Sequence, residues 1–314
     1  MCARDSRLDY KARSRRLRIG RLVLVAVVLL SILGGILIFS GKRSGSAHET
    51  RDLVQLWKAG SYPQVFQASE KELENKPMDF FLLMAHGFAA YQIALAQINS
   101  ADRLSYIDRS IWALRKAQLT KQGANDARVK YVLGRAYFYK GPSYANLCIQ
   151  YLEEARAARY VGEDIPEFLG LAYAQVQDYR SSVEAFSRAL ENEESGAGAS
   201  DLLLLAIARS YIELREGETA RPYIVRAIEN SHDFDTVSNA RLMLAGILRE
   251  SGAFSEAEAQ IMAVLNEGGD TAEARFALGE LFSALHDNYR ARAEWRKASR
   301  LDPNFAPARE RLST

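Results

Sequence analysis

The sequence predicts an all-α protein, in which stacked helix hairpins form an α-solenoid preceded by one N-terminal transmembrane helix. Three observations predict this architecture. The run 22–41 contains no charged residue. A small residue, followed three positions later by an aromatic or aliphatic one, then recurs five times at intervals of 34 to 38 residues. No segment alternates apolar and polar residues for long enough to predict a strand.

The uncharged run from Leu22 to Gly41 predicts the membrane segment. At about 1.5 Å per residue, its twenty residues span roughly 30 Å, the thickness of the hydrocarbon core of a bilayer. A buried globular helix does not need apolar residues on every face. A cleaved signal peptide is the alternative, but its apolar region is usually shorter, and the one candidate cleavage site, at Gly45 and Ala47, lies beyond Lys42 and Arg43.

The distribution of charge predicts the orientation of this segment. The chain has a net charge of +2, but residues 1–21 hold eight basic and two acidic groups, whereas residues 44–314 hold 31 Lys and Arg against 37 Asp and Glu. Basic residues favour the cytoplasmic side, so we expect a single-pass protein of the inner (plasma) membrane with a cytoplasmic N-terminus and a periplasmic or otherwise extracytoplasmic repeat domain. Small residues at Ser31 and Gly35 would allow weak self-association of the transmembrane helix.

The repeated signature defines five units of similar length. Their small residues are Gly134, Gly170, Ala208, Ala245 and Gly279. A small residue in the middle of a first helix lets a second, antiparallel helix approach closely, and the aromatic residues fill the seam between them. Pro166 and Pro303 fall at predicted helix starts, where the missing N–H has no cost. Each unit is therefore predicted to be one α-hairpin.

These signatures resemble those of the tetratricopeptide repeat (TPR) family, whose unit is a 34-residue helix hairpin. The resemblance covers 128–303 in five units and implies a right-handed α-solenoid of about six to seven TPR-like hairpins. Two weaker units, with Trp57 and Gly87 at compatible positions, precede them. The predicted organisation is a basic tail at 1–21, a transmembrane helix at 22–41, a linker at 42–50, degenerate units at 51–127 with an insertion near 94–105, five units at 128–303 and a capping helix at 304–314.

No pattern in the sequence predicts catalysis, a metal site or a cofactor. The four histidines and two cysteines do not stand at metal-ligand spacings, and no nucleophile motif or dinucleotide-binding loop is present. His86 and Cys148 are expected to be packed in helix seams. The acidic repeat domain lacks the electrostatic basis for binding nucleic acid. We therefore expect neither an enzyme nor a cofactor-binding protein.

The resemblance also implies where a partner would bind. In TPR proteins the first helices of successive units line a concave groove that binds peptides or helices. The residues of this chain at groove positions are Phe81, Met84, Phe88, Tyr91, Arg128, Tyr131, Arg135, Phe138, Tyr139, Leu171, Leu205 and Arg209. The N-terminal half of this groove is aromatic, with Arg128 and Arg135 able to pair with acidic groups of a protein or peptide partner. The alternative is that the aromatic side chains pack against the 94–105 insertion and fill the groove from within.

The sequence thus favours a membrane-anchored, non-enzymatic scaffold that binds protein partners in envelope, secretion or cell-wall assembly. An import or chaperone receptor on an organelle membrane, with its repeats in the cytosol, is the alternative. The Lys and Asn set with which some TPR proteins bind a C-terminal carboxylate is not present, so that specificity is not expected. An enzyme with an unrecognised site is a third, weaker alternative.

Overall fold

The computed structural model describes residues 47–194 and 200–313, which are helical and contain no strand. The chain divides into two compact units, Met1–Ile165 and Pro166–Thr314. The all-α class is confirmed. The predicted transmembrane helix at 22–41 and the tail at 1–21 lie outside the described residues. Among the helices that the structure describes, none combines the length and the hydropathy required to cross a bilayer.

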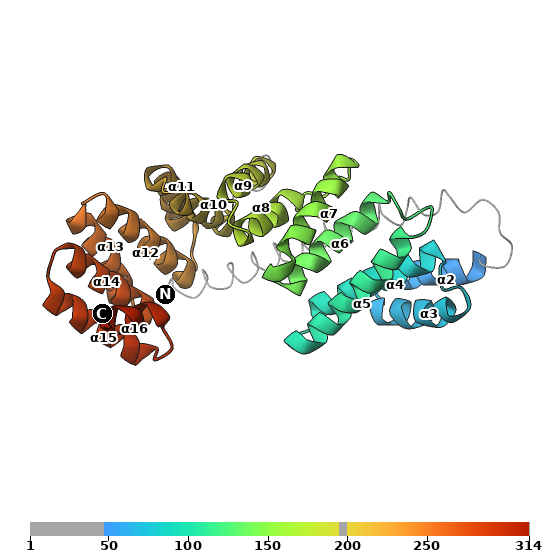
Figure 1. The fold of residues 1–314 in the computed structure, drawn as a ribbon, viewed down its shortest axis with the longest axis horizontal. Coiled ribbons are helices and arrows are strands. Elements are labelled where there is room, and N and C mark those ends of the chain that lie inside the picture. Colours follow the sequence, from blue (N-terminus) through green and yellow to red (C-terminus); the bar gives the residue numbers. More distant parts are fainter. Residues whose placement is uncertain (1–46, 195–199, 314) are drawn as a thin grey trace, which may run out of the picture. The chain divides into compact units, whose positions relative to one another are not determined.

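The first unit contains three helix hairpins, shown in blue to green in Figure 1. Its helices, in chain order, are α2 (Ala47–Lys58) with α3 (Tyr62–Asn75), α4 (Phe80–Ala96) with α5 (Ser100–Gln118), and α6 (Ala127–Lys140) with α7 (Ala145–Ala157), the last pair joined by the short 3₁₀ helix η1 (Pro142–Tyr144). The helix α2 begins at Ala47, within the predicted linker 42–50, so helix replaces the last residues of that linker. The first residues of α2 include neither Gly nor Pro and do not interrupt a helix.

The insertion predicted near 94–105 lengthens a hairpin. Its residues belong mostly to the end of α4 and the start of α5, and only Gln97, Ile98 and Asn99 separate the two helices. Asn99 caps α5, since its side-chain oxygen accepts hydrogen bonds from the backbone N–H groups of Ala101 and Asp102. The extra residues are therefore helical and do not form a long loop.

The second unit contains four hairpins and a terminal helix (Figure 1). They are α8 (Ile165–Gln175) with α9 (Tyr179–Glu194), α10 (Asp201–Glu213) with α11 (Gly217–Asn230), α12 (Phe234–Glu250) with α13 (Phe254–Asn266), α14 (Ala272–Ala284) with α15 (Asn288–Leu301), and α16 (Ala306–Ser313). The described residues thus form seven hairpins, the upper end of the predicted range. The last helix, α16, packs against α15.

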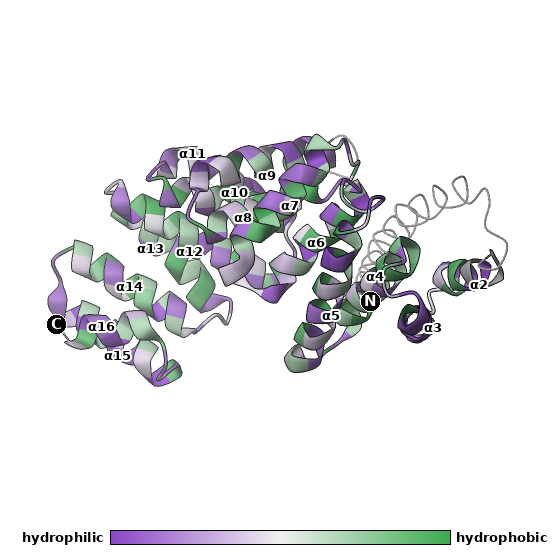
Figure 2. Cartoon of the chain, turned by 45° about the vertical axis from the view of Figure 1, so that its right-hand side comes forward, coloured by the Kyte–Doolittle hydropathy of each residue, from purple (hydrophilic) through white to green (hydrophobic). Residues whose placement is uncertain are grey.

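Polar capping residues mark the N-terminal limits of several of these helices. Asp79, Asp126, Asp233 and Thr271 each accept a hydrogen bond from a backbone N–H in the first turn of a first helix. Figure 2 shows hydrophilic and hydrophobic residues sharing most helices, as expected where one side of a helix is packed and the other faces water.

Small residues hold the two helices of a hairpin close together, as the repeat signature predicted. A Cβ atom built on Gly87 or Gly134 would lie 2.6 Å from the side chain of Leu114 or Leu152 on the opposite helix. The equivalent atom on Gly170 would lie 2.5 Å from the Phe186 ring. Real Cβ atoms do not approach other atoms so closely, so each of these positions excludes even a methyl group.

A pair of glycine substitutions tests this account. Gly170→Ala should lower the free energy of unfolding by about 1–3 kcal/mol, because the new methyl group overpacks the seam against Phe186. Gly246→Ala, in the middle of α12, is the matched control, since no atom lies within 4 Å of its Cβ position. It should be neutral or stabilising by up to about 1 kcal/mol. Urea unfolding followed by circular dichroism measures both; equal effects of the two substitutions would contradict the account.

Candidate functional site

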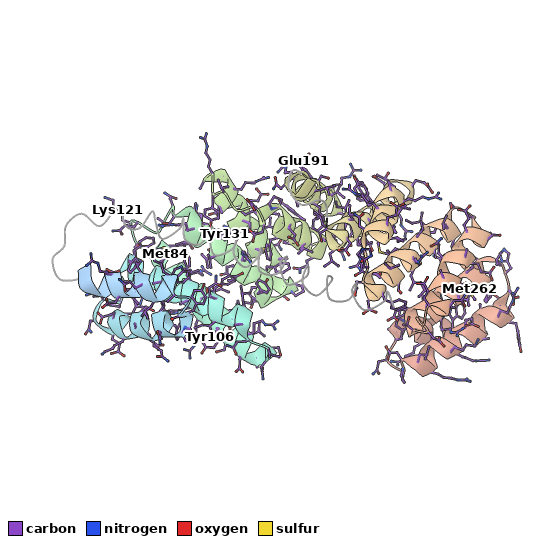
Figure 3. All side chains as sticks on the ribbon, turned by 180° about the vertical axis from the view of Figure 1, so that it is seen from behind. Met84, Tyr106, Lys121, Tyr131, Glu191 and Met262 are labelled. Carbon is purple, nitrogen blue, oxygen red and sulfur yellow. The ribbon has the colours of Figure 1, made fainter. Side chains whose placement is uncertain are left out.

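Four of the predicted groove residues are buried in the first unit. Met84, Phe88 and Tyr91 on α4 and Tyr131 on α6 are each at most 5% exposed. Figure 3 labels Met84 and Tyr131. The ring of Trp57, on α2, lies 6.4 Å from that of Phe88. These four side chains therefore pack within the unit, and the expectation that they offer an open aromatic surface does not match the structure.

An arginine between tyrosine rings forms the centre of this packing. The guanidinium carbon of Arg135 lies 5.4 Å from the ring centroid of Tyr91 and 5.5 Å from that of Tyr131. The ring of Tyr160, from the segment between α7 and α8, lies 4.7 Å from that of Tyr131. Cation–π contacts of this kind strengthen when water is excluded. The stacked side chains thus connect α4, α6 and the loop after α7.

Asp164 completes this cluster with a closed set of hydrogen bonds. Nη1 of Arg135 donates to the Tyr131 hydroxyl at 2.7 Å, and the hydroxyl donates to Oδ1 of Asp164 at 2.8 Å. Arg135 also forms an ion pair with Asp164 at 2.9 Å. Burial raises the pKa of Tyr91 and Tyr131, and raises that of Tyr160 to about 12, so all three hydroxyls stay protonated near neutral pH. We call Tyr91, Tyr131, Arg135, Tyr160 and Asp164 the tyrosine–arginine cluster.

The other candidates of the first unit are also engaged. Arg128 forms an ion pair with Asp126, the residue that caps its own helix. Phe81, Phe138 and Tyr139 are half-buried. Tyr139 lies 6.2 Å from Tyr91 and 5.6 Å from Phe138, measured between ring centroids. Both arginines that were expected to meet acidic groups of a partner thus have carboxylate partners within the chain.

The groups that cover the predicted groove come from several elements of the first unit. They include Trp57 of α2, Tyr139 of α6, and Tyr160 and Asp164 after α7. The alternative expected the aromatic side chains to pack against the 94–105 insertion, whereas the contacts named here come from other elements of the unit. Asp164 could not be found from the sequence, because it stands in the segment after α7, outside the repeat signature.

The candidates of the second unit differ in exposure. Leu205 is buried in the main core of the unit, and Leu171 packs beside Phe186 and Ile207. Arg209, on α10, is exposed. Here α12 packs against α10 and α14 as well as against its hairpin partner α13, so the first helices of three hairpins adjoin. Of the predicted residues in this unit, only Arg209 offers a charged group to solvent.

Further residues share this side of the three first helices. We define the first-helix face as Arg209 and Ile212 of α10, Leu242, Gly246 and Arg249 of α12, and Phe276 and Glu280 of α14. Ile212, Leu242 and Phe276 are partly buried against the core and leave part of each side chain in solvent. Glu280 is held by Arg249 at 3.4 Å and by Arg311 of α16 at 2.7 Å. The face is therefore part apolar and part charged.

The described residues bring together no candidate metal site. They contain no group of three or more His, Cys, Asp or Glu side chains placed to hold a metal ion. Cys148 is fully buried, and burial raises the pKa of its thiol to about 12, which keeps it protonated and unreactive. His86 is packed in a helix seam, where its ring stacks on Phe66 with 4.1 Å between centroids.

Comparison with known proteins identifies the fold. No protein-family model matches the sequence, and no curated protein is significantly similar to it. Solved structures do match. The C-terminal part of a TPR repeat-containing protein from Cytophaga hutchinsonii is 14% identical, with a TM-score of 0.56, over 84% of this chain and 100% of that one. A tetratricopeptide repeat protein from Parabacteroides merdae is 15% identical, with a TM-score of 0.51, over 85% of this chain and 98% of that one.

This chain has the tetratricopeptide repeat fold. PilF from Pseudomonas aeruginosa is a further similar structure, 14% identical with a TM-score of 0.51 over 72% of this chain and 96% of that one. At these identities the similarity concerns the fold and does not extend to partners. The first-helix face lies on the TPR helices that the resemblance assigned to partner binding.

The ion pair of the tyrosine–arginine cluster makes a testable contribution to stability. Asp164→Asn should lower the free energy of unfolding by about 2 kcal/mol, because it leaves the largely buried Arg135 without its carboxylate. Glu184→Gln serves as the control, because it removes the carboxylate that pairs with Arg188 on the exposed face of α9. Its free energy of unfolding should change by less than about 0.5 kcal/mol. Chemical unfolding of both variants measures the difference; similar values would show that Asp164 contributes no more than a surface ion pair.

His86 should make the stability of the first unit depend on pH. Burial lowers its pKa in the folded protein, an effect opposed by the Phe66 carbonyl and by Glu70. The unfolded chain binds a proton near pH 6.5, where the folded chain does not, so stability should fall as the pH drops below about 6.5. His86→Gln cannot take up this proton. The stability of the wild type relative to this variant should therefore decrease between about pH 7.5 and pH 5. A difference that is constant over this range would contradict the prediction.

Proposed function

We propose that this protein is a non-enzymatic scaffold that binds a protein or peptide partner through the first-helix face of its second unit. The observation that carries the proposal is the contrast between the two units. In the first, the aromatic and arginine side chains at groove positions pack against one another. In the second, an exposed arginine and partly exposed apolar side chains share the corresponding face. Such a mixed face is typical of protein interfaces.

We further propose that residues 22–41 anchor the protein in the inner membrane, with the TPR units on the extracytoplasmic side. The support for this part is the sequence alone: the length of the uncharged run and the eight basic residues before it. A scaffold in this place would serve envelope, secretion or cell-wall assembly. Protection of the repeats from protease in intact cells, and digestion once the outer barrier is opened, is the expected result. Digestion by a cytosolic protease would instead favour the receptor alternative.

Site-specific photo-crosslinking tests partner binding on the first-helix face. A benzophenone side chain at Ile212 or Leu242 in the full chain should form adducts with a partner in intact membranes, because both positions lie on this face and are partly exposed. The same group at Val225 on α11 or Met262 on α13, each 37% exposed, provides matched controls on second helices. Adducts of equal yield at all four positions, or none at any, would refute binding through this face.

A further inference from the structure

One glycine of the second unit has no packing role that explains it. Gly246 lies in the interior of α12, where glycine costs about 0.5–1 kcal/mol relative to alanine. The seam glycines, such as Gly170, stand against a side chain of the opposite helix, but no atom of the structure lies within 4 Å of a Cβ built on Gly246. Its backbone φ is not in the left-handed region that favours glycine. The fold would therefore accept alanine at this position.

The position of Gly246 in its repeat places it on the first-helix face. It directly follows the seam residue Ala245, as Arg209 follows Ala208 and Glu280 follows Gly279. Leu242 and Arg249, four residues before and three after, lie on the same side of α12. The helix α12 packs against both α10 and α14, which carry Arg209 and, on α14, Phe276 and Glu280 at the same places in their repeats.

Arg209 is exposed and forms no ion pair with any residue that the structure describes. Glu213, four residues along the same helix, is exposed but is not paired with it. In the first unit Arg135 occupies the same place in its repeat, directly after the seam residue Gly134, and there it binds the carboxylate of Asp164 at 2.9 Å. The protein thus contains its own example of the group that an arginine at this position binds.

We propose that the floor formed by Gly246 and Arg209 binds an acidic segment of another protein. A carboxylate of that segment pairs with Arg209, its main chain lies against the bare backbone of Gly246, and an adjacent apolar side chain contacts Leu242 and Ile212. This inference rests on the proposed function and specifies the chemistry of its partner. A charge-assisted pair of this kind fixes both the register and the orientation of the bound segment.

Charge favours an acidic segment of another protein over the chain's own N-terminal tail as the ligand of this surface. Residues 1–21 hold eight basic and two acidic groups, so the tail has the same sign of charge as Arg209. Arg249, the other arginine of the first-helix face, already pairs with Glu280 and Glu250. A cationic segment would face Arg209 with no compensating carboxylate paired to it, whereas an acidic segment would neutralise it.

Binding of matched peptides to the full chain in phosphatidylcholine nanodiscs tests this proposal. The probes are fluorescein-labelled peptides of about twelve residues with the repeating sequences Glu-Leu-Ser, Gln-Leu-Ser and Lys-Leu-Ser, and anisotropy is the readout. The wild type should bind the Glu peptide at least about fivefold more tightly than the other two, and this preference should weaken as salt is added. Empty nanodiscs provide the background.

Substitutions test whether Arg209 and Gly246 cause the preference for the Glu peptide. Arg209→Ala should reduce binding of the Glu peptide by roughly tenfold, to the level of the Gln peptide. Gly246→Leu should reduce binding of the Glu peptide by at least tenfold. Its Cβ meets no atom within 4 Å, so retention of the fold is expected and is checked by circular dichroism. Gly246→Ala should weaken binding while leaving thermal stability unchanged or higher. Arg180→Ala, an exposed arginine on α9, is the control and should bind as the wild type does.

Several outcomes would overturn the proposal. They are the absence of binding by all three peptides, equal binding of the three, and an unchanged affinity in Arg209→Ala. Concentration-dependent sedimentation of the chain that Arg209→Ala abolishes would assign the floor to a second copy instead. Adducts at Ile212 and Leu242 without a preference for acidic peptides would refute this inference and leave the proposed scaffold function standing.

Discussion

The close approach of two helices at a residue without a bulky side chain is the constraint on which this structure depends. At Gly87, Gly134, Gly170 and Gly279 a leucine or aromatic side chain of the second helix occupies the space that a Cβ would need. Burial of those side chains between the two helices stabilises each hairpin, at roughly 25 cal/mol per Å² of apolar area removed from water. Within each unit a hairpin contacts its neighbours in sequence, so stability accumulates hairpin by hairpin, and a change at one seam acts first on the adjoining hairpins.

The seam also decides which residues can serve another purpose. Once the small residue faces the second helix, the position that follows it points about 100° away around the first helix. Phe88, Arg135, Arg209, Gly246 and Glu280 all hold this position in their repeats. In the first unit the residue at this position packs inside the unit: Arg135 lies between two tyrosine rings and binds Asp164. In the second unit Glu280 is held by two arginines, and Arg209 and Gly246 leave surface uncovered. One repeat geometry thus produces a closed unit and an open face.

The helix hairpins could be predicted from sequence because their determinants are local and periodic. The spacing of Gly134, Gly170 and Gly279, together with capping residues such as Asp126 and Asp287, defines each unit without knowledge of its neighbours. The binding face could not be assigned in the same way. Tyr131 and Arg135 have the composition of an interface, and their burial depends on Tyr160 and Asp164, which belong to a loop that carries no repeat signature. Composition indicates what a face can bind, but only tertiary structure shows whether the chain itself already occupies that face.

Gly170 and Gly246 show the same limit for a single residue type. Both lie inside first helices, and in the sequence both are helix glycines one position apart in their repeats. The ring of Phe186 explains the first, because any side chain there would displace it. Nothing in the described structure stands opposite the second, so its intrinsic cost to the helix is not offset by packing. Gly246 costs helix stability and has no packing partner within the protein, so its role is explained most simply by close approach of a bound partner. The exposed arginine on the adjacent helix then indicates the charge of the group that approaches.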